Sequence, residues 1–380
     1  MNIAFVSECY PSPAKPQYCV FIEQQAAALQ QLGCNVVVIK LLRGDGIKEV
    51  CEFHDIEVRC IYLPSKRLDK VYCNMQSRLK ANNINWREFD IISIHIVSLP
   101  ITEAIVSECK DSNVPSVVHY HGLNVWHDYY EHKDIYHRIQ KLLVNRRKLK
   151  MLQNASAIVG VSKSVCEIVH ERLHQDNVYT VYNGVDASLF RPTEKVIDGT
   201  FKILCVANLI PIKGHQYLIQ AVRKLINDGY QIRLDLVGVG LYENNLKQLA
   251  KKLNLSEHVF FCGSKPYTEV AEMMKTADMF IMPSFYESFG CVYVEAMSTG
   301  TVTCGCDVYG PKEIIEDGVS GLLVKPKSVE SIVEAVKTVM DNPDLRKKLE
   351  QNAIKRAAKF SWHQSAKELE KVYKDSIANP

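Results

Sequence analysis

The chain has 380 residues, 47% of them hydrophobic and 23% charged, as expected for a globular protein large enough for two domains. Its net charge of +3 is too small to indicate a nucleic-acid partner, and its thirteen cysteines are scattered, with no zinc-type pairs. No apolar run reaches the roughly 18 residues of a membrane span, and no secretory signal opens the sequence, so we expect a cytoplasmic chain with reduced thiols and no metal.

Taken in chain order, short runs rich in Val, Ile, Phe and Tyr predict strands, and the longer amphipathic stretches between them predict helices. The first series of predicted strands lies at residues 3–7, 35–40, 56–62, 89–96, 115–120, 156–162 and 177–184. The second series lies at residues 201–208, 232–240, 258–263, 279–284 and 300–305. Strands that alternate with helices of this length indicate parallel α/β sheets.

A polar segment with proline and glycine, residues 186–200, separates the two series and suggests a linker. We therefore predict two Rossmann-like, doubly wound α/β domains, residues 1–187 and 200–357. The last helix, within residues 361–380, is expected to cross back onto the first domain. Ligands of such sheets lie at the carboxyl ends of the strands, so the two domains are expected to face a central cleft that holds two substrates.

Two acids, Glu287 and Glu295, stand eight residues apart around Gly290, where a helix is expected to begin. Eight helical residues span roughly 12 Å, whereas the paired carboxyls of glycoside hydrolases lie roughly 5 to 9.5 Å apart. We therefore interpret the acids as two anchors for the hydroxyl groups of one long ligand, with a phosphate at the helix N-terminus between them. A nucleoside diphosphate sugar has this layout. The alternative is that both acids only cap or solvate the helix.

The segment 283–324 resembles the donor-binding signature of glycosyltransferase family 4, whose members have the GT-B fold. The segments 181–192, 207–214, 236–263 and 360–373 are also similar to that family, and in the first domain so is "HYHGLNV" at 119–125. The resemblance implies a retaining transferase that moves a sugar from a nucleoside diphosphate sugar to a glycan or lipid-linked acceptor in cell-surface polysaccharide synthesis. It implies no cofactor or metal, and by family frequency the nucleotide is UDP.

The resemblance also implies roles for single residues. Glu287 would contact the transferred sugar, Glu295 the ribose, Lys213 the diphosphate, and His121 the sugar near the reacting centre. The remaining donor-binding positions are Asn208, Gly263, Ser288, Phe289 and Gly290.

The chain departs from the family at three places. Asn208 stands where an arginine is common, which leaves Lys213 as the one matching cation. The loop after the first strand has Tyr18 and Cys19 where family members often carry glycine. Family members also commonly carry two glycines before the position of Glu313, and this chain has only Gly310 there.

A basic stretch at residues 136–155 has two interpretations, contact with anionic lipid head groups or a solvated helix face. The same sequence bears on other functions. A Rossmann dehydrogenase needs a glycine-rich loop after the first strand, and this chain has none there. A sugar-nucleotide epimerase, a phosphorylase and a non-catalytic nucleotide-sugar binding protein stay open as alternatives.

Overall fold

The computed structural model describes residues 1–12, 18–43, 49–63, 82, 84–122, 150–173, 176–193 and 199–379. The chain divides into two compact units, which we call unit 1 (Met1–Asn183 with Trp362–Pro380) and unit 2 (Gly184–Ser361). The segment expected to link the domains belongs to unit 2. It is held there because Val185 pairs with Ser361 and the backbone oxygen of Phe190 accepts a hydrogen bond from Ser298 Oγ at 2.7 Å.

Unit 1 contains an eight-stranded sheet in the order β3-β4-β2-β1-β5-β6-β7-β8. The strands are β1 (Asn2–Ser7), β2 (Asn35–Arg43), β3 (Glu49–Phe53), β4 (Ile56–Leu63), β5 (Ile91–Ile94), β6 (Ser116–Tyr120), β7 (Ala157–Gly160) and β8 (Val178–Thr180). All neighbours are parallel except β3 and β4. Strand β3 was not predicted. It forms because His54 and Asp55 both have positive φ, 50° and 62°, as the two-residue turn of an antiparallel hairpin requires.

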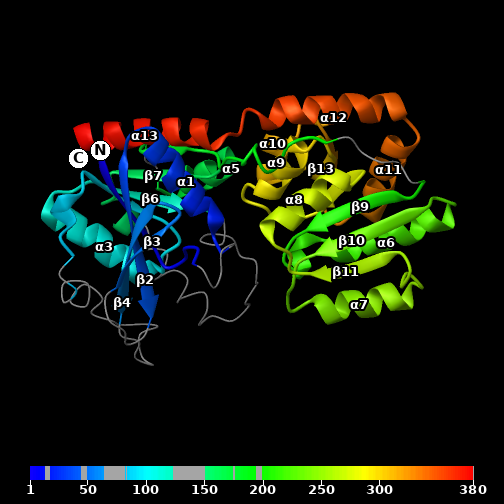
Figure 1. Cartoon of the computed structure of the whole chain (residues 1–380), viewed down its shortest axis with the longest axis horizontal. Coiled ribbons are helices and arrows are strands. Elements are labelled where there is room, and N and C mark those ends of the chain that lie inside the picture. Colours follow the sequence, from blue (N-terminus) through cyan, green and yellow to red (C-terminus); the bar gives the residue numbers. More distant parts are fainter. Residues whose placement is uncertain are drawn as a thin grey trace. The chain divides into compact units, whose positions relative to one another are not determined.

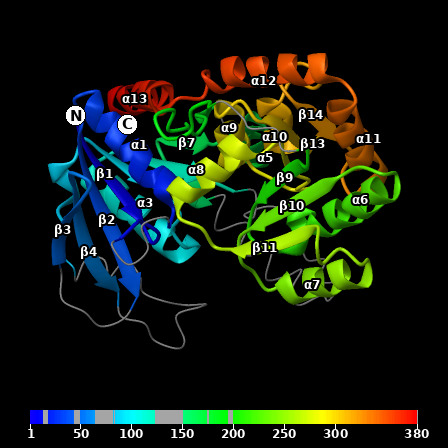
Figure 2. The same cartoon turned by 45° about the vertical axis from the view of Figure 1, so that its right-hand side comes forward.

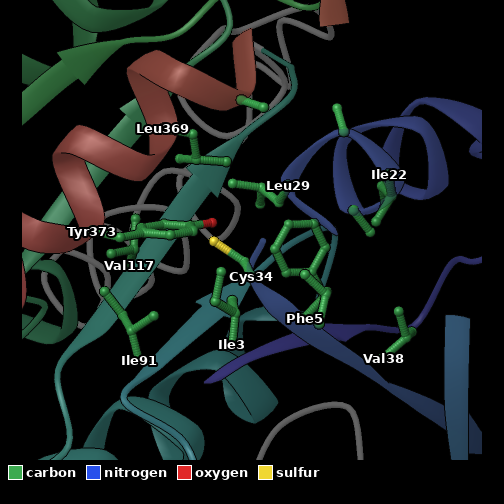
Figure 3. Packing of buried hydrophobic residues seen from close by; sticks show 14 of the residues in the cluster. Ile3, Phe5, Ile22, Leu29, Cys34, Val38, Ile91, Val117, Leu369 and Tyr373 are labelled. Atoms are coloured by element: carbon green, nitrogen blue, oxygen red, sulfur yellow. The ribbon is translucent and has the colours of Figure 1, made fainter. Parts of the chain in front are cut away.

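The helices of unit 1 are α1 (Val20–Gln31), α3 (Leu99–Ser112), α5 (Lys163–Leu173) and α13 (Trp362–Ala378), with a 3₁₀ turn η1 (Trp86–Glu88). Helix α13 belongs to this unit although it ends the chain, and it lies beside α1 (Figure 1). Its Leu369 and Tyr373 are fully buried in one core cluster with Ile3 and Val117 of the sheet (Figure 3). Burial of this apolar surface holds the C-terminal helix on unit 1.

Unit 2 contains a six-stranded, wholly parallel sheet in the order β11-β10-β9-β12-β13-β14, with helices on both faces (Figure 2). The strands are β9 (Phe201–Val206), β10 (Ile232–Val237), β11 (Val259–Gly263), β12 (Met279–Met282), β13 (Val302–Cys306) and β14 (Leu322–Val324). The helices are η3 (Pro211–Lys213), α6 (His215–Asn227), α7 (Glu243–Lys252), α8 (Tyr267–Thr276), α9 (Cys291–Ser298), α10 (Tyr309–Ile314), α11 (Val329–Met340) and α12 (Pro343–Ala357).

Both sheets are doubly wound, which confirms the predicted fold class. In unit 2 the strand order reverses between β9 and β12, and in unit 1 it reverses between β1 and β5. The loops that leave the carboxyl ends of such strand pairs diverge and leave room for a ligand. The residues after β9 and β12, and those after β1 and β5, are therefore where each unit can build a site.

Candidate functional site

In unit 2, two predicted residues meet at the point where the strand order reverses. Lys213 ends the turn η3 after β9, and Glu287 lies in the loop after β12. Their side chains form an ion pair of 2.5 Å between Nζ and Oε2, with 19% and 16% of the side chains exposed. The structure thus brings a cation and an acid together, partly shielded from water, at the carboxyl end of the sheet.

The loops that carry this pair are bonded to each other. The backbone oxygen of Ile212 accepts hydrogen bonds from the backbone nitrogen of Phe285 at 3.1 Å and from Ser284 Oγ at 3.3 Å. Gly214 has a φ of 76°, and a Cβ at this position would lie 2.1 Å from the backbone oxygen of Pro283. Only glycine permits this approach, so the glycine after Lys213 fixes the distance between the two loops.

Three neighbouring predicted residues, Ser288, Phe289 and Gly290, lead into helix α9. Gly290 caps the helix with a φ of 88°, which confirms that a helix begins there. Ser288 and Phe289 are buried, and Gly310 packs so closely on them that a Cβ would lie 2.5 Å from Phe289 Cα. The N-terminus of α9, which begins four residues after Glu287, carries a positive partial charge that suits a phosphate group.

Glu295 lies inside α9 and is 5% exposed. Its Oε1 accepts a hydrogen bond of 2.7 Å from the hydroxyl of Tyr267, the first residue of α8. Burial raises the pKa of Glu295 to about 7, while the hydrogen bond from Tyr267 acts in the opposite direction. The two acids therefore bond to different partners, Lys213 for Glu287 and Tyr267 for Glu295.

Asn208 and Gly263 also lie at the carboxyl ends of unit 2 strands. Gly263 ends β11 with a φ of 66°, and its oxygen accepts a hydrogen bond from the backbone of Gly238 at 2.8 Å. Asn208 follows β9 and is exposed. Among the described residues, its side chain bonds to none of the other predicted site residues.

In unit 1, His121 follows β6 and joins a chain of hydrogen bonds. Its Nε2 lies 3.1 Å from Nδ1 of His95, and Nε2 of His95 lies 2.8 Å from Ser93 Oγ. The Ser93 hydroxyl also contacts the Tyr373 hydroxyl at 2.5 Å and Nε2 of His119 at 2.9 Å. We call these five residues the histidine relay. It connects His121 to the core through β5, β6 and α13.

Burial lowers the pKa of His121 to about 4 and holds the pKa values of His95 and His119 well below their usual range. All three rings are therefore neutral near pH 7. Three histidines this close could suggest a metal site, but the rings are stacked, with angles of 12° to 26° between their planes. A shared ion has to lie near the plane of every ring, so this stacking favours hydrogen bonding within the cluster.

A cavity of about 790 Å³ opens beside the relay in unit 1. Its polar lining comes from the loops after β1, β5 and β6, and includes Glu8, Cys9, Tyr18, Ser98 and His121. The rest of the lining is mainly aliphatic, with Leu41, Leu42, Ile94, Ile96, Leu99 and Val118. The cavity thus combines apolar walls with hydrogen-bonding groups near the point where this sheet reverses its order.

The sequence indicates the two acids and His121 as site residues, but it does not indicate the side chains that bond to them in the structure. Tyr267 follows a glycine-ended strand, as Glu287 follows β12, so its place in the chain was a usable signal. His95 directly follows β5, as His121 follows β6. Nothing local to residue 373 indicated that its hydroxyl bonds to Ser93, because that contact spans 280 positions. The basic stretch 136–155 falls mostly outside the described residues.

No helix among the described residues is both long and apolar enough to cross a membrane.

Two family models match the chain. The model for glycosyltransferase family 4 matches residues 20–189, and the model for glycosyl transferases group 1 matches residues 188–356. An uncharacterised glycosyltransferase of Methanocaldococcus jannaschii is 34% identical over 57% of this chain and 59% of its own length. A D-inositol 3-phosphate glycosyltransferase of Corynebacterium glutamicum is 28% identical over 60% of each chain. The matched region spans about 60% of these relatives.

Solved structures share the fold over the whole chain. The Anabaena protein HepE in complex with UDP superposes with a TM-score of 0.76 at 19% identity, covering 99% of this chain and 100% of that one. The sucrose-phosphate synthase of Thermosynechococcus elongatus superposes with a TM-score of 0.80 at 20% identity and full coverage of both chains. At these identities the likeness concerns the fold, which is that of the GT-B proteins.

Proposed function

The chain belongs to the family 4-type glycosyltransferases, and on this premise we propose that it transfers a sugar from a uridine diphosphate sugar to a hydroxyl group. The observation that carries the proposal is the layout of unit 2. A Lys–Glu pair and a helix N-terminus lie at the reversal of strand order, and a second, buried acid lies inside that helix. Structures of Anabaena HepE hold UDP and UDP-glucose on this fold, which supports the choice of donor.

The donor's two ends would meet the two acids. The ribose diol would donate two hydrogen bonds to Glu295, replacing or extending its bond to Tyr267. The diphosphate would lie at the N-terminus of α9, near the backbone of Ser288, Phe289 and Gly290. The sugar would then reach Glu287. Asn208 and Gly263 would border the donor at the ends of neighbouring strands.

Lys213 would change partners when the donor binds. In the structure its ammonium group is paired with Glu287. A diphosphate carries more charge than one carboxylate, so Lys213 would turn to the phosphate oxygens and release Glu287 to accept hydrogen bonds from the sugar. As the bond to the sugar breaks, negative charge grows on the departing phosphate, and Lys213 with the α9 amides would stabilise it.

His121 would donate or accept a hydrogen bond at the sugar as a neutral ring. Its Nε2 is used by His95, and its buried Nδ1 has no hydrogen-bond partner among the described residues. The Ser93 hydroxyl can donate to only one histidine, and that choice decides which nitrogen of His95 and of His121 carries the proton. The relay would thus set whether His121 Nδ1 donates to a ligand or accepts from it.

We further propose retention of configuration, with the departing phosphate taking the proton of the acceptor hydroxyl on the same face. We assign neither Glu287 nor Glu295 as a nucleophile, since Glu287 pairs with Lys213 and the buried Glu295 is hydrogen-bonded to Tyr267. The chemistry proposed needs no metal, because Lys213 and the helix N-terminus supply positive charge. A chelator such as EDTA should therefore leave turnover unchanged.

The acceptor would enter the cavity of unit 1. Its aliphatic walls fit a lipid-linked or otherwise partly apolar acceptor, and Glu8, Ser98 and His121 offer hydrogen bonds to a glycan hydroxyl. Synthesis of a cell-surface polysaccharide is the role that we propose for such a transfer. The place of action would be the cytoplasm, with contact to the inner membrane face if residues 136–155 bind anionic lipid.

A two-step assay tests the proposal. Thermal shift across UDP- and GDP-sugars should show stabilisation by a uridine-linked donor, because a ligand that binds only the folded state raises its stability. Release of the nucleoside diphosphate with a panel of glycan and lipid-linked acceptors should then follow, and Glu287→Gln should abolish it. Tight binding without release for any acceptor would instead favour a nucleotide-sugar binding protein.

A further inference from the structure

The hydroxyl group of Tyr267 reaches the buried acid of unit 2 from a neighbouring helix. Tyr267 is the first residue of α8, and α8 packs beside α9, which carries Glu295. The hydroxyl donates to Glu295 Oε1 at 2.7 Å, a length typical of a hydroxyl that donates to a carboxylate. Among the described residues, no hydrogen bond reaches the other carboxyl oxygen, Oε2. The acid is therefore held at one oxygen, and the other is left to accept hydrogen bonds from a ligand.

The ring of Tyr267 is itself held by the chain segment that precedes β9, residues 186–190. Phe190 of this segment lies edge-on to the ring, with 4.9 Å between the ring centroids and 68° between their planes. Phe190 is fully buried, and its backbone oxygen accepts a hydrogen bond from Ser298, the last residue of α9. Helix α9 thus carries both the acid and the residue that anchors the support of the phenol. The position of the Tyr267 hydroxyl relative to Glu295 is therefore set by contacts on two sides.

The ionisable groups that act on the Tyr267 hydroxyl are all acidic. Besides Glu295, they are Cys291 of α9 and Asp186 of the segment before β9. Burial, followed by the charge of Glu295, raises the pKa of Tyr267 far above its usual value, so the phenol keeps its proton and remains a donor. For Glu295, burial raises the pKa and the hydrogen bond from Tyr267 lowers it. The bond therefore favours the ionised form of the acid, which has lone pairs for both ribose hydroxyls.

We propose that Tyr267 is the positioning residue of the ribose site, holding Oε1 of Glu295 so that Oε2 faces the ribose hydroxyls. This inference rests on the proposed function, in which Glu295 accepts hydrogen bonds from the ribose. Tyr267 acts through Glu295 and does not touch the donor. A carboxylate that is already bonded at one oxygen has lost much of its freedom to rotate, so less freedom is lost when the nucleotide binds.

The same unit contains a matched pair that separates this role from the satisfaction of hydrogen bonds alone. Tyr230 also donates its hydroxyl to a carboxylate, that of Asp341, at 2.9 Å. This pair is exposed, and Tyr230 precedes β10, so it lies at the amino end of the sheet and not at the carboxyl end. Tyr267→Phe and Tyr230→Phe each remove one hydrogen bond of the same kind. Only Tyr267→Phe should change how nucleotide binding depends on pH.

The first test follows the carboxyl group of Glu295 in the ligand-free chain, by NMR of carbon-13-labelled glutamate. Its signal is assigned by its loss in Glu295→Gln. In the wild type its pKa should be about 7. Tyr267→Phe keeps the ring beside Phe190 and removes the hydroxyl alone, so it should raise that pKa by about one unit, whereas Tyr230→Phe should leave it unchanged. An unchanged pKa in Tyr267→Phe would overturn the proposal whether or not the chain binds a nucleotide.

The second test measures the Kd of UDP-glucose by calorimetry from pH 6 to 8.5. In the wild type and in Tyr230→Phe, the Kd should fall as Glu295 loses its proton. In Tyr267→Phe this fall should come about one pH unit later, which leaves the affinity about fivefold weaker at pH 7. Thermal melting confirms that each variant is folded. If the wild type binds no UDP-glucose at any pH, the proposed function fails and this inference with it. If it binds with a pH dependence that Tyr267→Phe leaves unchanged, the positioning role alone fails.

Discussion

The two points where the strand order reverses, one in each unit, have the same topology but carry side chains of different chemistry. In unit 2 the loops after β9 and β12 carry an ion pair and lead into a helix N-terminus. Glycines allow the backbones of these loops to approach closely. In unit 1 the loops after β1, β5 and β6 carry neutral histidines and border a cavity with mainly aliphatic walls. The winding of the sheet fixes where a ligand can bind, and the loop residues decide what kind. Unit 2 is suited to a dianionic group and unit 1 to a neutral, partly apolar one.

The largest effect should come from the charges of unit 2. Glu287→Gln and Lys213→Ala should each lower kcat at least about a hundredfold, because each removes a group that stabilises the reacting sugar or the departing phosphate. The matched control is the Lys265–Glu269 pair of the same unit, which is more exposed, at 30% and 46%. Glu269→Gln should keep near-normal turnover. If Glu287→Gln also keeps near-normal turnover, the charged pair of unit 2 is not what suits that unit to the diphosphate sugar.

Unit 2 should also depend on the close contact between its loops. Gly214→Ala places a Cβ 2.1 Å from the Pro283 oxygen and keeps a left-handed backbone. Gly229→Ala is the control, since it has a φ of 92° and no atom within 4 Å of the added Cβ. The backbone conformation costs about 1–2 kcal/mol in both variants, and the clash adds to it in Gly214→Ala alone. Thermal melting should show a clearly larger loss of stability for Gly214→Ala, and equal losses would mean that the loops are not held in this way.

Donor affinity should depend on pH through Glu295. The carboxylate form accepts both ribose hydroxyls, and with a pKa of about 7 that form is scarce at pH 6 and dominant at pH 8. The Kd of a UDP-sugar, whose diphosphate does not titrate in this range, should fall about tenfold from pH 6 to 8. Calorimetry measures it, with Glu295→Gln as the control. A variant that keeps the full pH dependence would exclude Glu295 as its source.

Stability should depend on pH through unit 1. Its buried histidines are neutral when folded, with pKa values below the 6.5 of the unfolded chain. Between those values the unfolded chain binds more protons, so stability is complete above about pH 6.5 and declines as the pH falls toward 4. Thermal melting from pH 7.5 to 5 should show this decline, and replacing His119 with Gln should weaken it. Equal slopes in both chains would contradict the neutral cluster.

The smallest effect should come from the far end of the histidine relay. Tyr373→Phe removes the hydroxyl group that contacts Ser93 Oγ and leaves the His121–His95 hydrogen bond in place. We expect a loss of a few-fold in kcat with unchanged KM for the donor, since Tyr373 positions other groups and touches no substrate. Steady-state kinetics with the donor varied measures both values. A larger rise in KM than fall in kcat would place Tyr373 in a purely structural role for the cavity.

Most of the strands and the site loops could be predicted because each depends on short stretches of sequence. The apolar runs that form strands, the glycine at 290 and the acids at 287 and 295 are all signals that lie within a few neighbouring residues. The groups that complete the site could not be predicted in this way. Tyr267 meets Glu295 across 28 positions, and Tyr373 meets Ser93 across 280, because the sheet order and the return of α13 bring them together. Strand β3 was missed because its turn uses His54 and Asp55 rather than glycine.

In the proposed donor site, Glu295 and Glu287 bind the two ends of one nucleotide sugar. Calorimetric titration of uridine, UDP and a UDP-sugar into the wild type, Glu295→Gln and Glu287→Gln tests it most directly. Glu295→Gln should weaken all three ligands by a similar factor, whereas Glu287→Gln should weaken the UDP-sugar alone. If Glu287→Gln weakens uridine as strongly as Glu295→Gln does, the two acids do not mark opposite ends of a single ligand.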